Sequence, residues 1–469
     1  MKALPFLKSL GYLLFLNLLI KPLWIFGVDR QVQNVVGPQT YGSYFALLSL
    51  TYVLSFFADA GLTQMVNRQV AAGERFGAAQ LLRVKGFLLL GYVALVVLFA
   101  GLSGIKDWAL LWPIIFIQAL TSFYVFLRHL VTAHQLFATD AVLSVIDKGL
   151  MLLIFLPLLY TSFFPHFVSI FTFVYVQLGC TATAITVALI VLVKKGVLQQ
   201  QGSTAPVASR TVLPFAFIIL LMSAHNRLDA FLLLRLRPDG AYQAGLYAAA
   251  YRLLDAGNMI GYLTASFLVP FMAKHMENKL LVQATVLASR LGLLVAGGVS
   301  AAFVVVFAAP VQALLYPQLP GQALPVLQTC IAVLPAYLLL HVYGSVLTAA
   351  AQLKSFIFLL LGAFITNLLL NLWLIPLYGA LGCCVAALVS QYAVALATFV
   401  MATRKINMDY GLRSLAAVVL TVAAAAAFFY AGRQNVLNPF WCLLMAGTGA
   451  VLLLMAYIPA FKKHFVSSL

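Results

Sequence analysis

Charged side chains are scarce in this sequence of 469 residues, of which only 8% are Asp, Glu, Lys or Arg. Soluble domains carry about 25% charged residues and about half apolar ones. Here 64% of the residues are hydrophobic and the mean hydropathy is +1.04. A soluble fold of this size could not cover so much apolar surface. The composition therefore excludes a soluble globular protein and predicts an all-α polytopic membrane protein.

Cysteines and catalytic motifs are also few. Five cysteines lie inside apolar runs, without the spacing of metal ligands or of a disulfide framework: Cys180, Cys330, Cys383, Cys384 and Cys442. We expect buried apolar side chains there, and no metal centre. Walker A, H-E-x-x-H and G-x-S-x-G motifs are absent. These absences exclude ATP-driven transport and the familiar hydrolases, and no catalytic residue or cofactor is expected beyond a coupling H⁺ or Na⁺.

Long apolar runs dominate what is present, and runs of about 20 residues mark helices that cross a bilayer. We expect about fourteen such helices, near 8–28, 42–66, 84–103, 108–130, 142–160, 167–193, 211–236, 241–270, 284–308, 324–350, 355–376, 379–402, 413–431 and 440–460. An even number of spans places both termini on the same side of the membrane.

The longest polar connection, 194–210, separates six spans from eight. We therefore expect an N-terminal six-helix lobe (1–193), a cytoplasmic linker (194–210), a C-terminal six-helix lobe (211–402) and two additional C-terminal helices (403–469).

Lysine and arginine gather on the side of the N-terminus, which the positive-inside rule assigns to the cytoplasm. One such loop is expected to hold Arg68, Arg75, Arg83 and Lys85, whereas the outer loops hold only Arg30, Lys106, Arg235, Arg237 and Arg433. The net charge of +17 thus faces the anionic inner leaflet of the bilayer. Nucleic-acid binding is not expected, because no soluble basic surface is present.

Two patterns recur in the same order in both halves of the chain. Residues 37–44 read GPQTYGSY and residues 240–247 read GAYQAGLY, both fitting G-x4-G-x-Y. Further along, TAHQL (132–136) is matched by TAAAQL (348–353). The repeat predicts two pseudo-symmetric six-helix lobes followed by two extra helices. Membrane proteins built from such repeats are mostly transporters, with the substrate between the halves.

The stretch VVGPQTYGSYFALLSLTYVLSFFADAGLTQMVNRQVA, together with RLDAFLLLR and then GLYAAAYRLLD in the second half, resembles bacterial Wzx-type polysaccharide flippases. These belong to the multidrug/oligosaccharidyl-lipid/polysaccharide exporter (MOP) superfamily. The resemblance covers essentially the whole chain. It implies a cavity between two lobes, alternating access, and a flippase that carries undecaprenyl-pyrophosphate-linked oligosaccharide from the cytoplasmic to the periplasmic leaflet.

Charged residues within the spans are the candidate site, because a charge in lipid is costly. Lys21 and Arg227 occupy corresponding places ahead of Gly37 and Gly240. Our hypothesis is that both face one cavity and attract the pyrophosphate, since the planar arginine fork donates two bonds to phosphate oxygens. Asn17, one turn from Lys21, would add a sugar contact. Outward snorkelling or structural pairing of both cations is the alternative.

Other polar residues within the spans have two interpretations each. Arg252 is a further substrate-binding candidate, or it forms an intrahelical pair with Asp255. Candidates for ion coupling are Asp59, Asp229, Asp255 and His341, since a lone membrane carboxylate can hold a coupling proton or sodium. For Asp59 the alternative is a pair with a basic residue such as Lys21, and for His341 a neutral ring bonded to a neighbour.

The function expected is therefore a flippase in a bacterial cytoplasmic (inner) membrane, serving O-antigen or exopolysaccharide synthesis, and not an enzyme. Its partners would be the lipid-linked glycan, the lipid bilayer and polysaccharide polymerase or assembly proteins. The alternatives are a multidrug or cation antiporter of the same superfamily, then a lipid II flippase, then a membrane glycan polymerase or ligase.

Overall fold

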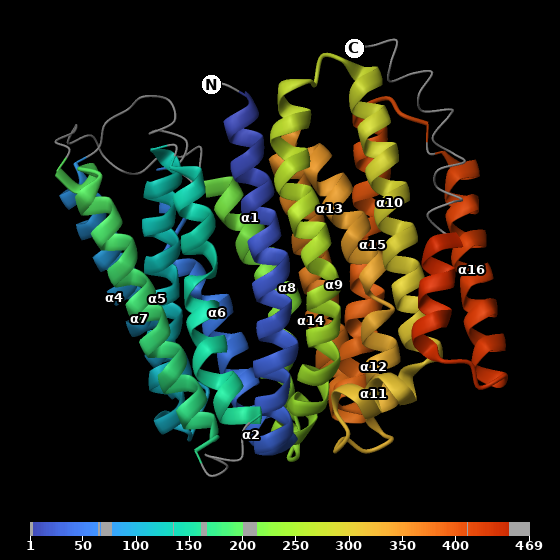
Figure 1. Cartoon of the computed structure of the whole chain (residues 1–469), viewed down its shortest axis with the longest axis horizontal. Coiled ribbons are helices and arrows are strands. Elements are labelled where there is room, and N and C mark those ends of the chain that lie inside the picture. The colour runs from blue at the N-terminus through green and yellow to red at the C-terminus, as the bar shows by residue number, and fades with distance from the viewer. Residues whose placement is uncertain are drawn as a thin grey trace. The chain divides into compact units, whose positions relative to one another are not determined.

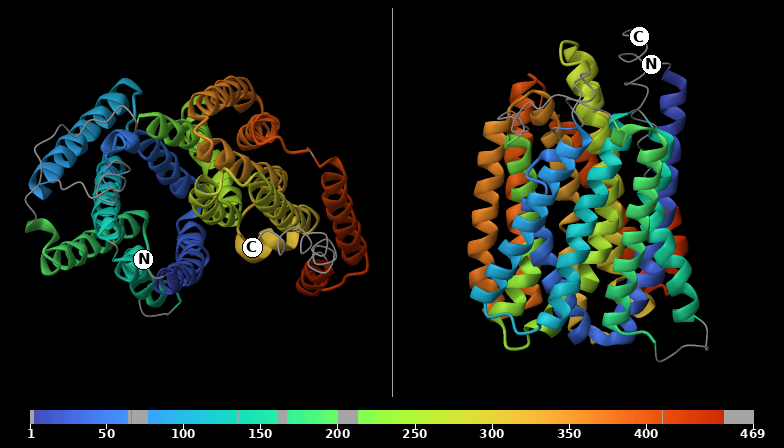
Figure 2. Two further views of the ribbon diagram at one scale, coloured as in Figure 1. Left: turned by 90° about the horizontal axis from the view of Figure 1, so that it is seen from above. Right: turned by 90° about the vertical axis from the view of Figure 1, so that its left-hand side faces the viewer.

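The computed structural model describes residues 3–63, 66, 77–134, 136–160, 167–199, 213–409 and 411–449. The chain divides into two compact units, Met1–Leu234 and Arg235–Leu469, each built from long helices (Figures 1 and 2). In the described residues, twelve helices are long and apolar enough to cross a membrane. A helix satisfies its own peptide groups, which lipid cannot do. The predicted all-α polytopic fold is confirmed, whereas the lobe and linker boundaries stay predictions.

The first unit takes its helices in chain order from α1 to α8, the last of which ends just beyond it: α1 (Ala3–Leu23), the π-helix η1 (Trp24–Asp29), α2 (Arg30–Leu54), the 3₁₀-helix η2 (Ser55–Ala58), α4 (Ala78–Leu102), α5 (Trp108–Ala133), α6 (Phe137–Tyr160), α7 (Ile170–Lys194), the 3₁₀-helix η3 (Val197–Gln199) and α8 (Leu213–Leu236).

The second unit continues from α9 to α16: α9 (Gly240–Lys274), α10 (Lys279–Val306), α11 (Ala308–Leu315), α12 (Ala323–Ile331), α13 (Leu334–Ala349), α14 (Leu353–Tyr378), α15 (Ala380–Lys405) and α16 (Leu412–Gln434). The expected tenth span is thus two helices, with Pro335 in the first turn of α13. Of the expected fourteenth span, 440–449 are helical, and 450–460 lie outside the described residues.

The first two expected spans form one helical stretch that bends at Gly37. This residue has φ +81°, a conformation that glycine adopts at little cost, and the helix is kinked there. The connection expected at 29–41 is therefore helical on both sides of a single kink. Before the kink, the helix widens into the π-turn η1, a distortion often found at functional sites.

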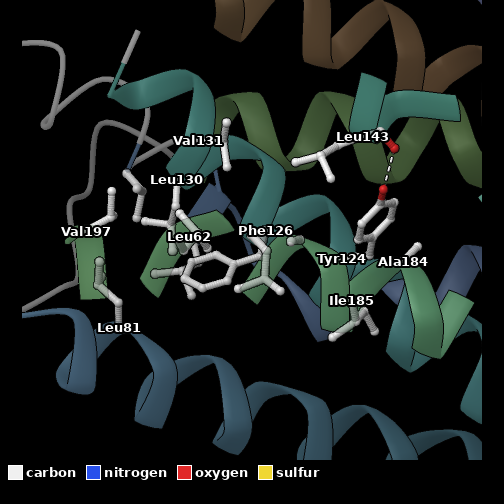
Figure 3. Packing of buried hydrophobic residues seen from close by; sticks show 14 residues of the cluster. Leu62, Leu81, Tyr124, Phe126, Leu130, Val131, Leu143, Ala184, Ile185 and Val197 are labelled. Carbon is white, nitrogen blue, oxygen red and sulfur yellow. Dashed lines mark hydrogen bonds between the residues drawn. The ribbon is translucent and has the colours of Figure 1, made fainter. Parts of the chain in front are cut away.

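Apolar side chains from α4, α5, α6 and α7 form the core of the first unit. Phe126 and Leu130 of α5 are buried against Leu81 of α4 and Ala188 of α7. Figure 3 shows Tyr124, whose hydroxyl donates to the backbone carbonyl of Leu143 in α6. The polar end of this tyrosine is thus satisfied inside an apolar cluster.

Both copies of the second sequence repeat occupy equivalent connections. TAHQL joins α5 to α6, and TAAAQL joins α13 to α14. Each turn closes with the same i to i−5 backbone bond, from Leu136 N to Val131 O at 3.2 Å and from Gln352 N to Leu347 O at 2.8 Å. The predicted repeat therefore extends to the backbone geometry of this turn.

Helices α14 and α15 come together so tightly that Gly382 cannot carry a side chain. A Cβ there would lie 2.5 Å from the backbone oxygen of Leu374. We expect Gly382→Ala to cost about 1–3 kcal/mol of unfolding free energy through overpacking, measured as a lower melting temperature in detergent. Gly362→Ala in α14 is the matched control, because a Cβ there meets open space. Equal melting temperatures for both variants would contradict this packing.

Candidate functional site

A buried carboxylate lies where the kinked helix folds back on itself. Asp29, at the end of η1, is only 1% exposed. Tyr41, beyond the Gly37 kink, donates its hydroxyl to Asp29 Oδ1 at 2.9 Å. The kink therefore brings a donor back onto the acid. Such a bond matters because a buried carboxylate without donors is costly.

Two cations from other helices surround Asp29 at electrostatic range, Lys148 of α6 and Arg227 of α8. The Lys148 ammonium lies 4.3 Å from the ring centre of Trp24 and 3.3 Å from Asp147. The Arg227 guanidinium lies 5.3 Å from the ring centre of Tyr52. Both cations thus combine an aromatic face with a nearby carboxylate, which stabilises them away from water.

Lys21 joins the same group of charges about two turns before Asp29. It lies within electrostatic range of Arg128, Asp147 and Lys148. It is partly buried, and it forms no hydrogen bond or ion pair with any residue that the structure describes. Lys148 is thus a common neighbour of Lys21 and Asp29, and it links Lys21 to Arg227. That Lys21 and Arg227 face one cavity remains a prediction.

Asn17, one turn before Lys21, anchors α1 beside this network. Its amide nitrogen donates to Ser144 Oγ of α6 and to the backbone oxygen of Leu13, both at 2.8 Å, and the residue is buried. Both donors are therefore used within the protein, which gives Asn17 a role in fixing α1 against α6. The expected sugar contact stays untested.

We name seven charged residues of α1, η1, α5, α6 and α8, which are connected by ion pairs or lie within electrostatic range of one another, the basic network. Its cations exceed its acids by one, and its members are Lys21, Arg128, Lys148 and Arg227 with Asp29, Asp140 and Asp147. Arg128 and Asp140 form a two-point pair, with nitrogen–oxygen distances of 2.8 and 3.1 Å.

Asp59 is paired with Lys85 rather than with Lys21, at 2.8 Å. The assignment of Lys85 to a loop was wrong, because α4 begins at Ala78 and the lysine is fully buried inside the unit. Asp59 lines a cavity of about 250 Å³ within the first unit, together with Gln118, Ser122 and His129 of α5 and Ser223 of α8.

His225 and Asp229 are both buried on α8, with 2% and 1% exposure. Their spacing of four residues places them on one face of that helix. Arg227 is less buried than either. The face of α8 that carries His225 and Asp229 is therefore buried.

In the second unit, Arg252 of α9 lies within electrostatic range of Asp255 and of Tyr316. His341 of α13 is buried, and its Nε2 lies 3.0 Å from Asn258 Oδ1 of α9. An amide oxygen only accepts, so this contact assigns the Nε2 proton to His341.

A second fully buried cation, Arg290, lies on α10. It donates to the hydroxyls of Tyr343 and Ser414, and its guanidinium lies 5.9 Å from the ring centre of Phe399. Gly411, with φ +62°, leaves room for it, because a Cβ there would lie 2.6 Å from Arg290 Nη2. Each unit therefore carries a fully buried cation, Lys85 on α4 in the first and Arg290 on α10 in the second.

Sequence reasoning missed Asp29 and Lys85. The expected first span ended one residue before Asp29. For Lys85 a signal existed, because it continues the buried stripe of Leu81, Tyr92 and Val96, spaced by four, seven and four residues. That spacing would have placed Lys85 on the inner face of a helix.

The fold has relatives among solved structures, all at identities that show the fold alone. The chain is similar to the lipid II flippase MurJ in an inward closed conformation, with a TM-score of 0.68 and 11% identity over 97% of this chain and 99% of that one. It is also similar to an outward-facing multidrug resistance MATE transporter of the MOP superfamily (TM-score 0.59, 13% identity, 85% and 96% covered). A third is a MOP superfamily transporter from Pyrococcus furiosus (TM-score 0.59, 14% identity, 85% and 96% covered). The fold is thus that of the MOP transporters.

The family follows from the sequence itself. The profile of the family described as polysaccharide biosynthesis protein matches residues 6–276, more than half of the chain. The chain therefore belongs to the polysaccharide biosynthesis protein family, and the resemblance to Wzx-type flippases of the MOP superfamily is confirmed. No curated protein matches the sequence.

The bond between Tyr41 and Asp29 has a measurable consequence for stability. We expect Tyr41→Phe to cost about 1–3 kcal/mol of unfolding free energy, because a buried acceptor loses its donor. The double variant Tyr41→Phe with Asp29→Asn should recover part of that loss, since a neutral amide needs less compensation. Thermal unfolding in detergent measures both, with Tyr175→Phe, at an exposed tyrosine of α7, as the control. Additive losses in the double variant would contradict the coupling.

Proposed function

We propose that the protein is a flippase that turns an undecaprenyl-pyrophosphate-linked oligosaccharide from the cytoplasmic to the periplasmic leaflet by ion-coupled alternating access. Membership of the polysaccharide biosynthesis protein family supports the glycan. Similarity to MurJ over 97% of the chain supports movement of a lipid-linked substrate. The proposal places the protein in a bacterial inner membrane, with both termini cytoplasmic, and makes it a transporter rather than an enzyme.

The observation that carries this proposal is the partly buried ammonium of Lys21 in the basic network, which forms no ion pair with the described part of the chain. Two further cations, Arg128 and Lys148, lie within electrostatic range of Lys21, so its charge raises the energy of the empty site. A pyrophosphate bound there would lower that energy with charge-assisted hydrogen bonds. Arg227 adds a planar guanidinium at the other side of Asp29, and a fork of this kind suits phosphate oxygens.

A multidrug or cation antiporter is the nearest alternative, because MATE transporters share the fold. A cationic drug needs an unpaired carboxylate. In the first unit, however, Asp59 is paired with Lys85 and Asp140 with Arg128. This pairing favours an anionic ligand. A lipid II flippase would use the same phosphate chemistry and differs only in the glycan.

Lipids retained by the purified protein test the substrate. We expect mass spectrometry to find a polyprenyl-pyrophosphate glycan with the wild type and a several-fold loss with Arg227→Gln or Lys21→Gln, because each change removes a phosphate partner. Lys106→Gln, at an exposed loop position, is the matched control and should retain the lipid. Ordinary phospholipids alone in every sample would contradict the glycan substrate, and lipid II in the wild type would select the alternative flippase.

Pro22 tests alternating access. It follows Lys21 and precedes the π-turn η1, and it provides no N–H for the carbonyl four residues earlier. If α1 bends here during the cycle, Pro22→Ala should slow glycan export several-fold while leaving the retained lipid unchanged. Pro157→Ala, near the end of α6, is the control. Export at the wild-type rate with Pro22→Ala would rule out bending at this point.

A further inference from the structure

The second span is interrupted inside the first unit. Helix α2 ends at Leu54, the 3₁₀-helix η2 follows, and Ala60 and Gly61 then have φ of +41° and +83° before the chain becomes helical again at Leu62. Irregular backbone at membrane depth is tolerated only where protein covers it or where it lines a wet cavity. Asp59 lies at this break, and it lines the cavity described above.

Lys85 closes the end of the interrupted helix. Its ammonium donates to the backbone oxygen of Ala58 at 2.9 Å, to Asp59 Oδ1 at 2.8 Å and to Ser122 Oγ at 2.9 Å. These bonds use all three donors of the ammonium, and the Phe126 ring covers it at 5.6 Å. A helix C-terminus favours a positive charge, and in transporters such ends coordinate a coupling ion. Here the Lys85 ammonium, which is covalently part of the protein, occupies the position of the coupling ion at the helix end.

Asp59 differs from its partner in its access to water. Its side chain is 27% exposed, whereas that of Lys85 is 0% exposed. Thr63 donates its hydroxyl to Oδ1 and its backbone N–H to Oδ2, the latter at 3.2 Å. A carboxylate has about four acceptor positions, so Oδ2 keeps room for a proton. Within this ion pair, Lys85 is therefore shielded from water, whereas Asp59 is accessible to it.

His129 lines the same cavity and lies within electrostatic range of Asp59. Its Nδ1 is 2.8 Å from the backbone oxygen of Val125. A carbonyl only accepts, so Nδ1 carries the proton, and Nε2 of the neutral ring is an acceptor. Among the residues that the structure describes, the other charged or titratable side chains around the cavity are Tyr52, Arg227, whose guanidinium lies over the Tyr52 ring, and Arg128, which is held by Asp140.

We propose that Asp59 is a proton-exchange site of the transport cycle, with Lys85 as a built-in cation that takes the place of a metal ion. The site then accepts H⁺ and not Na⁺, because the position at the helix end is already filled. This inference rests on the proposed transport function and adds the identity of the coupling ion to it.

Protonation changes the pair in a defined way. A proton from cavity water, directly or through His129 Nε2, forms an O–H bond on Asp59, and the net charge of the Asp59–Lys85 pair rises from 0 to +1. Lys85 is then a buried cation without its counter-charge, which costs several kcal/mol. Separation of α4 from the 55–61 break relieves that cost by admitting water or an anionic group. Release of the proton restores the pair and closes the break.

The test needs no glycan substrate. The full-length protein with Ser223→Cys carries a thiol in the cavity lining, and all five native cysteines are buried. We expect its rate of maleimide labelling to change with pH by up to about tenfold per unit, because the protonated fraction of one carboxyl changes by that factor. Asp59→Asn in this background should label at the low-pH level throughout, once its rate at each pH is divided by that of the double variant described below, because the thiol itself ionises with pH. Replacing sodium with choline should change nothing.

The double variant Asp59→Asn with Lys85→Met is the matched control. It removes both charges, so it leaves no buried ion unpaired if the single variant fails to fold, and its profile reports the thiol chemistry alone. A pH profile of the parent identical to that of the double variant would overturn the proton site. Labelling that depends on sodium would overturn the choice of ion. Lipid retention by Arg227→Gln tests the flippase proposal separately, so the two failures are distinguishable.

Discussion

An ionised side chain inside the hydrocarbon layer costs several kcal/mol unless other groups of the protein compensate it. The first unit meets this constraint by connecting its charges. Lys85 uses every donor that it has, Asp29 receives the Tyr41 hydroxyl and lies between Lys148 and Arg227, and Arg128 holds Asp140 at two points. The kink at Gly37 and the break at 55–61 supply the changes of direction that make these contacts geometrically possible. The contacts between the buried charges therefore depend on the kink and the break in the helices.

The two halves satisfy the constraint in related ways. Each contains a fully buried cation that is bonded to hydroxyl groups of neighbouring segments, Ser122 for Lys85 and Tyr343 with Ser414 for Arg290. Lys85 is also paired at 2.8 Å with the carboxylate of Asp59, which lines a cavity. The buried cation of the first unit is therefore part of an ion pair that reaches a cavity.

The existence of the long helices and of the repeat could be predicted from the sequence, because both depend on local composition and spacing. The extent of the helices could not. The partners of Lys85 lie 26 to 37 residues away in the sequence. A short stretch of sequence around Lys85 therefore does not show that this lysine, near the expected start of a helix, is buried inside the unit. Asp29 was missed for a related reason, since a hydropathy run ends at a charge even where the helix continues. The break within the second span was equally hidden, because its turn-forming residues Ser55, Asp59 and Gly61 are interspersed with apolar ones.

Arg290 has a consequence for motion within the second unit. Its bond to Ser414, the close approach of Gly411 and the apolar contacts of Val299 and Phe303 with Phe429 tie α16 to α10 at both ends. Gln283 adds bonds to the backbone oxygens of Ile406 and Asn407, at the start of the connection to α16. Helix α16 is therefore expected to move together with α10 and not independently of it. A spectroscopic probe on the exposed face of α16 would report the displacement of α10 without touching any residue of the basic network.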